Sequence, residues 1–195
     1  MLTPPDNLQT NEKIILGKAF FWDPVLSGSK DVACATCHHS SLAYADNLDL
    51  AIGTNGIGLG ALRHFISPSL IAFAKRNTTM IVNVGFNGLD ENQNYDPAKA
   101  VMFFDNRVTG LELQSPEPLK TVKEMMGHGL TASCVLDTIT GRLKNIPGYV
   151  DLFNKAFGPN SITVPNIAKS IASFERTMYL IMRLTINIFA GMLQR

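Results

Sequence analysis

The chain has 195 residues, enough for one compact domain with its own hydrophobic core. Hydrophobic residues make up 46% of it and charged residues 17%, a composition that excludes a disordered, collagen-like or coiled-coil chain. Seventeen basic and sixteen acidic residues leave a formal net charge of +1, too small for the attraction that phosphate backbones or anionic membranes require. We therefore expect no nucleic-acid partner.

The two ends of the chain carry no pattern typical of targeting or membrane insertion. The first seven residues have neither the basic nor the apolar stretch of a secretory signal peptide, so we expect none in this sequence. The most apolar run, residues 178–193, is about one or two residues too short for a membrane span and carries Arg183 near its middle. We expect it to form a buried or interfacial helix.

The first predicted element is a helix. It begins after Thr10, a favourable N-cap residue, and ends at Asp23 and Pro24. From about Asp46 to Asp105 the helical pattern gives way to a long glycine-rich stretch, which lacks the spacing of a phosphate-binding loop. Long loops inside a compact domain are usually functional, so we expect this stretch to carry part of a site.

Three further helices are predicted in the last third of the chain. Apolar stripes on residues 132–144 and 149–156 are separated by Pro147, which predicts a helical hairpin. Cys134 lies on the first stripe and is expected to be a small buried hydrophobe. A last helix opens after Thr163 and buries one face. No strand pattern competes, so the sequence predicts an all-α fold in a single domain, residues 1–195.

The motif Cys34-Ala-Thr-Cys37-His38 has the spacing of a covalent haem c site. Two thiols one helical turn apart can bond to the vinyl groups, and the adjacent imidazole can bind iron. A thioredoxin-like pair would need a preceding strand, which the sequence does not supply. A zinc site would need about two more ligands. These could come only from the remaining histidines and the third cysteine: His39, His64, His128 and Cys134.

Several separated segments resemble, in one order, the N-terminal haem domain of the bacterial di-haem cytochrome c peroxidase and MauG family. The resemblance covers about residues 5–178, and residues 179–195 diverge from it. The segments that carry it are residues 16–27, 76–78 with Asn83, 103–107, 111–125, 142–149 and 171–176. The resemblance implies a cytochrome c-like helical domain with long irregular loops around one haem c.

The resemblance also implies peroxide chemistry at a haem whose proximal iron ligand is His38. Gln114, Pro118 and Glu124 would line the distal face, with Glu124 as the group that moves protons and Gln114 orienting peroxide. An apolar haem pocket would raise the pKa of Glu124 toward the useful range. Without the resemblance, spacing alone would favour a solvated Glu124 and a surface Gln114.

Two further residues acquire roles only through the resemblance. His64 resembles the removable distal haem ligand of some family members, and Asn77 resembles a ligand of the family's calcium ion. The resemblance further implies hydrogen peroxide as substrate, a small redox protein of cytochrome c or cupredoxin type as donor, a periplasmic location and a homodimer.

Two departures from the family pattern affect the expected activity. The family's second Cys-x-x-Cys-His motif is not found in this sequence, and Phe104 stands where the family usually has an oxidisable Trp. We therefore expect peroxide activation but poor steady-state turnover by this chain alone, and weak calcium binding.

Two other function classes stay open. One is a monohaem electron carrier in which a methionine sulfur takes the sixth iron position; the candidates are Met80, Met102, Met125 and Met126. The other is a fragment that never receives haem.

Overall fold

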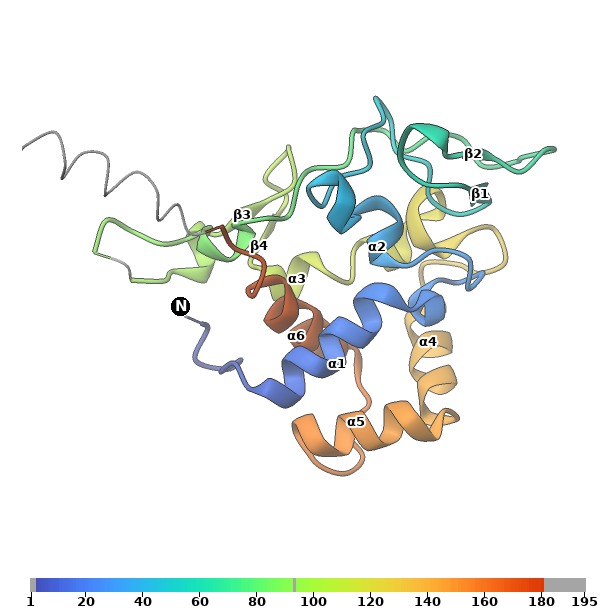
Figure 1. The fold of residues 1–195 in the computed structure, drawn as a ribbon. Coiled ribbons are helices and arrows are strands. Elements are labelled where there is room, and N and C mark those ends of the chain that lie inside the picture. The colour runs from blue at the N-terminus through green and yellow to red at the C-terminus, as the bar shows by residue number, and fades with distance from the viewer. Residues whose placement is uncertain (1–2, 93, 181–195) are drawn as a thin grey trace, which may run out of the picture.

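The computed structural model describes residues 3–92 and 94–180. The described chain is mainly helical, with short strands in the glycine-rich stretch (Figure 1). The helices are α1 (Asn11–Trp22), α2 (Cys34–Cys37), α3 (Leu111–Gln114), α4 (Val135–Lys144), α5 (Pro147–Phe157) and α6 (Val164–Glu175). The strands are β1 (Gly56–Ile57), β2 (His64–Phe65), β3 (Val101–Met102) and β4 (Val108–Thr109). Most of the helix expected over residues 178–193 lies outside the described residues.

Helices α1 and α6 form the closest helix pair of the fold, and they lie side by side in Figure 1. The Thr10 side chain accepts a hydrogen bond from the Lys13 amide at 3.3 Å, which caps α1 as predicted. Gly17 lies directly against the Ser170 carbonyl, where a Cβ atom would overlap with the oxygen. A glycine in α1 therefore allows the two backbones to approach each other.

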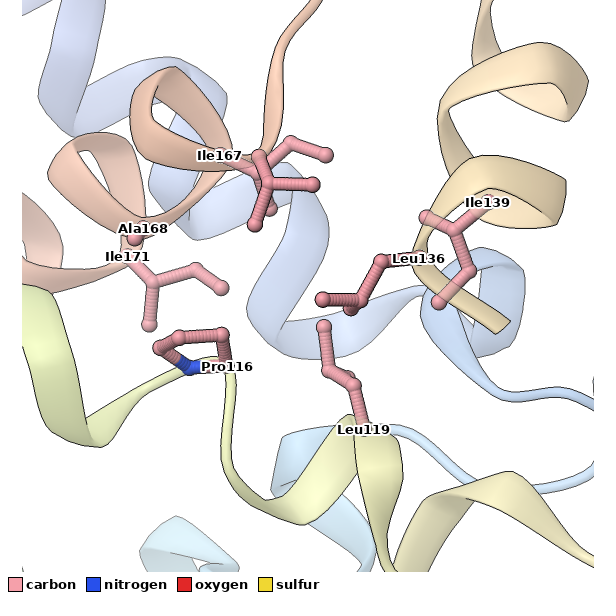
Figure 2. A pocket seen from close by; sticks show the side chains of 8 residues that line it. Pro116, Leu119, Leu136, Ile139, Ile167, Ala168 and Ile171 are labelled. Carbon is pink, nitrogen blue, oxygen red and sulfur yellow. The ribbon is translucent and has the colours of Figure 1, made fainter. Parts of the chain in front are cut away.

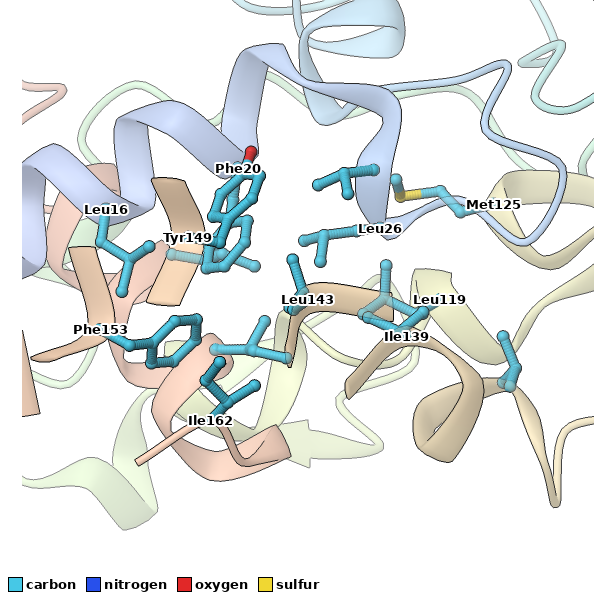
Figure 3. Close-up of a cluster of buried hydrophobic side chains, with 14 of the residues drawn as sticks. Leu16, Phe20, Leu26, Leu119, Met125, Ile139, Leu143, Tyr149, Phe153 and Ile162 are labelled. Atoms are coloured by element: carbon cyan, nitrogen blue, oxygen red, sulfur yellow. The ribbon is translucent and has the colours of Figure 1, made fainter. Parts of the chain in front are cut away.

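The main hydrophobic core lies between α1, α4, α5 and α6 (Figure 3). The Phe20 ring of α1 stacks on the Tyr149 ring of α5, with centroids 5.0 Å apart and planes 5° from parallel. Phe153 packs beside Phe20 at 5.9 Å. The Tyr149 hydroxyl donates to Asp23 Oδ2 at 2.9 Å, so its one polar group is satisfied at the edge of the core.

The helical hairpin of α4 and α5 is confirmed, but one expectation within it is wrong. Helix α4 begins at Val135, and Cys134 is exposed rather than buried. The reason is its place at the N-cap, outside the buried stripe, where its sulfur accepts from the Thr131 hydroxyl at 3.2 Å. The apolar pattern in the sequence therefore predicted burial for one residue beyond the start of the helix, Cys134.

The stretch between residues 46 and 109 contains structure that the sequence did not indicate. Strands β1 and β2 pair antiparallel, with Gly56 opposite Phe65, and β3 pairs with β4. Two-residue strands are too short for an alternating pattern to appear in the sequence.

A buried ion pair joins α6 to α3. The Arg176 guanidinium, only 1% exposed, donates to both carboxylate oxygens of Glu112, at 2.5 and 2.9 Å. Asn7 donates to the same carboxylate at 2.7 Å. This network ties the N-terminal segment to both helices.

Among the described residues, none of the helices is long and apolar enough to cross a membrane.

Candidate functional site

The two thiols of the Cys-x-x-Cys-His motif lie at either end of the single-turn helix α2 (Cys34–Cys37). The Thr36 hydroxyl accepts a hydrogen bond from the Ala33 amide at 3.0 Å and so fixes the start of the turn. Both cysteines are free. Burial raises the pKa of Cys34 to about 12 and that of Cys37 to about 11, so both thiols stay protonated.

This environment fits a thioether better than a thiolate. A thioether sulfur carries no charge, so burying it costs little, whereas zinc or redox chemistry needs the thiolate. Within residues 3–92 and 94–180, no three His, Cys, Asp or Glu side chains come together in a group that could hold a metal ion.

The His38 imidazole is oriented by a backbone carbonyl. Its Nδ1 atom lies 3.1 Å from the carbonyl oxygen of Tyr44, so Nδ1 carries the proton and the lone pair is on Nε2. Burial lowers the pKa of His38, against the raising influence of carbonyls of Tyr44 and Thr79 and of Asp46. A neutral imidazole with Nδ1–H held by a carbonyl is the form that binds iron.

A strained turn places the Tyr44 carbonyl at this position. Ala43 and Tyr44 have φ values of 55° and 58°, in the left-handed region that L-residues seldom adopt. The turn is closed by the Tyr44 amide, which donates to the His39 carbonyl at 2.9 Å. Such strain is typical of functional sites, and here it serves His38. The residues 34–44 therefore fit a covalently bound haem c.

Glu124 lies on a rare π-helical turn, Val122–Met126, of the kind often found at functional sites. Its carboxyl group is half-buried. Burial raises the pKa of Glu124, Arg107 lowers it and Glu117 raises it further, with burial the largest cause. The carboxyl therefore holds its proton to a higher pH than an exposed glutamate does.

Residues 52–54 bring this turn close to α2. The Cys37 sulfur lies 3.9 Å from the Ile52 carbonyl oxygen. Two residues on, the Thr54 amide donates to the Glu124 carbonyl at 3.0 Å. The structure thus brings the Glu124 backbone and the second thiol of the motif into contact with the same short peptide, although they are far apart in the sequence.

Gln114 and Pro118 lie on the turns that lead to Glu124. Gln114 is the last residue of α3 and is half-buried, and its side chain makes no hydrogen bond within the described part of the chain. Pro118 opens a short 3-10 turn that ends at Lys120, directly before the Val122–Met126 turn.

His64 and Asn77 lie on the outside of the glycine-rich stretch. His64 is exposed on β2, with Nδ1 3.0 Å from the Leu62 carbonyl oxygen. Asn77 is exposed and donates to the Leu48 carbonyl. Neither side chain has a hydrogen bond to His38 or Glu124 in the described residues.

The four methionines that are candidates for the sixth iron position differ in burial, and Phe104 lies on the surface. Met125 and Met126 belong to the main core and Met102 to a smaller buried cluster, whereas Met80 is exposed. Phe104 is 60% exposed and packs under the Arg76 guanidinium, 5.7 Å from its ring centroid.

An apolar crevice lies between α6, α4 and the segment at Pro116 (Figure 2). Its lining contains no titratable group, and it is too narrow to admit a water molecule. It is a packing gap of the core and offers no chemistry.

Sequence reasoning missed two parts of the site. Tyr44 acts through its backbone carbonyl, so the identity of its side chain does not indicate this role in the sequence. Residues 52–54 act through backbone groups and the Thr54 hydroxyl, which donates to the Val122 carbonyl at 3.0 Å. The only signal was their place in a long loop.

The family model of the di-haem cytochrome c peroxidases matches residues 11–181. The methylamine utilization protein MauG of Methylorubrum extorquens is 32% identical over 176 residues, which cover 90% of this chain and 40% of MauG. The cytochrome c551 peroxidase of Nitrosomonas europaea is 28% identical over 174 residues, which cover 89% of this chain and 41% of the relative. The chain thus spans about two fifths of the length of these relatives.

Solved structures show the same fold. A MauG-like protein associated with microbial copper homeostasis superposes with a TM-score of 0.72 at 23% identity, covering 97% of this chain and 47% of that one. The diheme peroxidase BthA from Burkholderia thailandensis gives 0.61 at 17% identity, covering 90% and 41%. The expected cytochrome c-like helical fold and the family resemblance are confirmed, and the chain belongs to the di-haem cytochrome c peroxidase family.

Proposed function

We propose that the chain is a peroxidase-type c-haem domain, which activates hydrogen peroxide for reduction to water with electrons from a small redox protein. We expect its steady-state turnover alone to be poor, because Phe104 stands where the family usually has an oxidisable Trp. The observation that carries the proposal is the position of Glu124: its carboxyl is half-buried and of raised pKa, and its backbone carbonyl is hydrogen-bonded to the 52–54 peptide, which contacts Cys37. Cys34 and Cys37 would attach the haem and His38 would bind its iron. When bound, the haem supplies the redox chemistry that breaks the O–O bond.

Glu124 would move the proton that this cleavage requires. One oxygen of hydrogen peroxide must lose its proton and the other must gain one to leave as water. A carboxylate within hydrogen-bond reach, or one water away, can accept the first proton and return it to the leaving oxygen. The raised pKa of Glu124 brings the carboxyl toward the pH at which it can do both.

Gln114 and Pro118 would shape the space around that proton transfer. The Gln114 amide has both donors and an acceptor available, so it can hold peroxide or a water in a fixed orientation. Pro118 fixes the backbone that joins α3 to the turn of Glu124.

The remaining assignments rest on the family alone. We propose a donor of cytochrome c or cupredoxin type, a periplasmic location, a homodimer, a calcium ion near Asn77 and His64 as a removable distal ligand. Their support is the family membership and the names of relatives such as cytochrome c551 peroxidase.

The test is stopped-flow mixing of the ferric, haem-loaded chain with hydrogen peroxide. Glu124→Gln keeps the shape of the side chain and removes the base, so the reaction should slow about 10²–10⁴-fold. Glu12→Gln is the matched control, because it makes the same chemical change on an exposed carboxyl in the first turn of α1. Equal rates for the wild type and Glu124→Gln would remove Glu124 from the mechanism.

A further inference from the structure

The turn that carries Glu124 lies between two glycine-containing loops. A Cβ atom on Gly53 would overlap with the Glu124 carbonyl oxygen, and a Cβ atom on Gly28 would overlap with the Met126 carbonyl oxygen. We call residues 52–58 the Gly53 loop and residues 25–28 the Gly28 loop. Only glycine permits both loops to approach the turn this closely.

Each loop also donates one backbone hydrogen bond to the turn. The Thr54 amide of the Gly53 loop donates to the Glu124 carbonyl at 3.0 Å. The Gly28 amide donates to the Met125 carbonyl at 2.8 Å. The position of Glu124 therefore depends on single backbone hydrogen bonds from two loops, since the turn belongs to no sheet and is not part of a longer helix.

A buried arginine fixes the Gly53 loop. Arg63, only 6% exposed, donates through Nε to the Ile52 carbonyl at 2.6 Å, through Nη2 to Gly53 at 2.6 Å and through Nη1 to Gly58 at 3.0 Å. The planar guanidinium thus connects three carbonyls of one loop.

A second arginine fixes the Gly28 loop in the same way. Arg142, on α4, donates through Nη1 to the Val25 and Ser27 carbonyls at 2.5 and 2.7 Å, and through Nη2 to Gly28 at 3.1 Å. These partners lie 114 to 117 residues away along the chain.

Asp31 joins the two loops to each other. Its carboxylate accepts from the Asn55 amide of the Gly53 loop at 2.7 Å and from the Ser27 hydroxyl of the Gly28 loop at 3.0 Å. The loops, the aspartate and the two guanidinium groups form one frame around the Val122–Met126 turn.

The positive charge of Arg63 is attracted by Asp31 and Asp46, but neither carboxylate lies within ion-pair distance of it. Within residues 3–92 and 94–180 neither Arg63 nor Arg142 forms an ion pair; both are satisfied by carbonyl oxygens. Burying a guanidinium costs free energy that a neutral residue would not, so its geometry must contribute something else. Three donors in one plane remove the conformational freedom that the glycines would otherwise give these loops.

We propose that Arg63 and Arg142 are positioning residues that hold the turn of Glu124 through the Gly53 and Gly28 loops and so fix its carboxyl for proton transfer. This inference rests on the proposed function. A displacement of about 1 Å in a reacting group can lower the rate about 10²-fold. Loss of the guanidinium of Arg63 or Arg142 should therefore slow the peroxide reaction about 10- to 100-fold.

The experiment is a double-mutant cycle on the haem-loaded full chain. The rate of the ferric protein with hydrogen peroxide is measured from pH 5 to 9 for the wild type, Arg63→Gln, Glu124→Gln and the double variant. Because Arg63 acts through Glu124, Arg63→Gln in the wild-type background should lower the rate and shift its pH profile. In the Glu124→Gln background the same substitution should not lower the rate further. Arg142→Gln is tested in the same cycle.

A readout other than peroxide activity is the association of cyanide with the ferric protein. Hydrogen cyanide must give up its proton to a nearby base as it binds, so the same carboxyl sets the pH dependence. Arg63→Lys keeps the charge but loses the three-carbonyl geometry and should behave like Arg63→Gln. Ser161→Ala loses a buried hydrogen bond to the Phe153 carbonyl, outside the frame, and should leave both profiles unchanged.

The outcomes separate the two levels of the proposal. No effect of Glu124→Gln would overturn the proposed function and this inference with it. A normal effect of Glu124→Gln, with an equal slowing by Arg63→Gln in both backgrounds, would leave the proposed function standing and overturn the positioning role. An unchanged pH profile in Arg63→Gln would overturn it as well.

Discussion

Glu175 is a buried carboxyl in the last turn of α6. Its side chain is 7% exposed, and Oε2 has no hydrogen-bond partner in the described part of the chain. Burial raises the pKa of Glu175 to about 8, against the lowering influence of Arg176. The folded protein therefore binds this proton more tightly than the unfolded chain, whose value is 4.5.

This difference predicts a pH-dependent stability. The stabilising effect of a raised pKa is fully present below about pH 4.5 and is lost as the pH rises toward about 8. Glu175→Gln should flatten the fall in thermal midpoint between pH 5 and 8, and Glu12→Gln, on an exposed carboxyl, should not. An identical fall in the wild type and Glu175→Gln would contradict the assignment.

Residues that act through their own side chains were easier to predict than residues that act through the backbone. Cys34, Cys37 and His38 are adjacent in the sequence, so their spacing alone indicates haem. Arg63 gave no signal, because its partners are three carbonyls that any sequence could supply. Cys134 was misplaced because it lies at a helix boundary, where periodicity is least informative.

Helices α1 and α6 meet at a glycine whose role can be tested. A methyl group at Gly17 would overlap with the Ser170 carbonyl, whereas a methyl group at Gly141 of α4 has nothing within 4 Å. Gly17→Ala should therefore destabilise the protein by about 1–3 kcal/mol, because the helices must separate. Gly141→Ala should stabilise it by up to about 1 kcal/mol, because alanine favours the helix.

Urea unfolding of the two variants measures both effects. Gly17→Ala should lower the urea concentration at the unfolding midpoint, and Gly141→Ala should raise it. A stabilising Gly17→Ala would contradict the close approach of α1 and α6.

Long amphipathic elements were predicted well, and short elements were not. Helices α1, α4, α5 and α6 begin or end within a few residues of their capping signals. The Val122–Met126 turn has five residues, too few for periodicity, and depends on loops from two distant parts of the chain. The element that carries Glu124 is thus specified by tertiary contacts.

At the scale of the whole molecule, segments far apart in the sequence converge near α2. The thiols come from α2, the carbonyl that orients His38 from the turn after it, and the 52–54 peptide from the glycine-rich stretch. Glu124 comes from the far side of that stretch. The cysteines, His38 and the Tyr44 turn are close in the sequence, but the contact of Glu124 with residues 52–54 is not, which is why spacing alone favoured a solvated Glu124.

The covalent attachment of one haem tests the central claim most directly. After expression with a c-type maturation system, the intact mass of the denatured chain should increase by one haem, and the band should retain a haem stain. Cys37→Ala should abolish this increase, whereas Cys134→Ala, on the exposed thiol, should leave it unchanged. A chain that binds zinc in place of haem, or that carries equal haem with and without Cys37, would contradict the account.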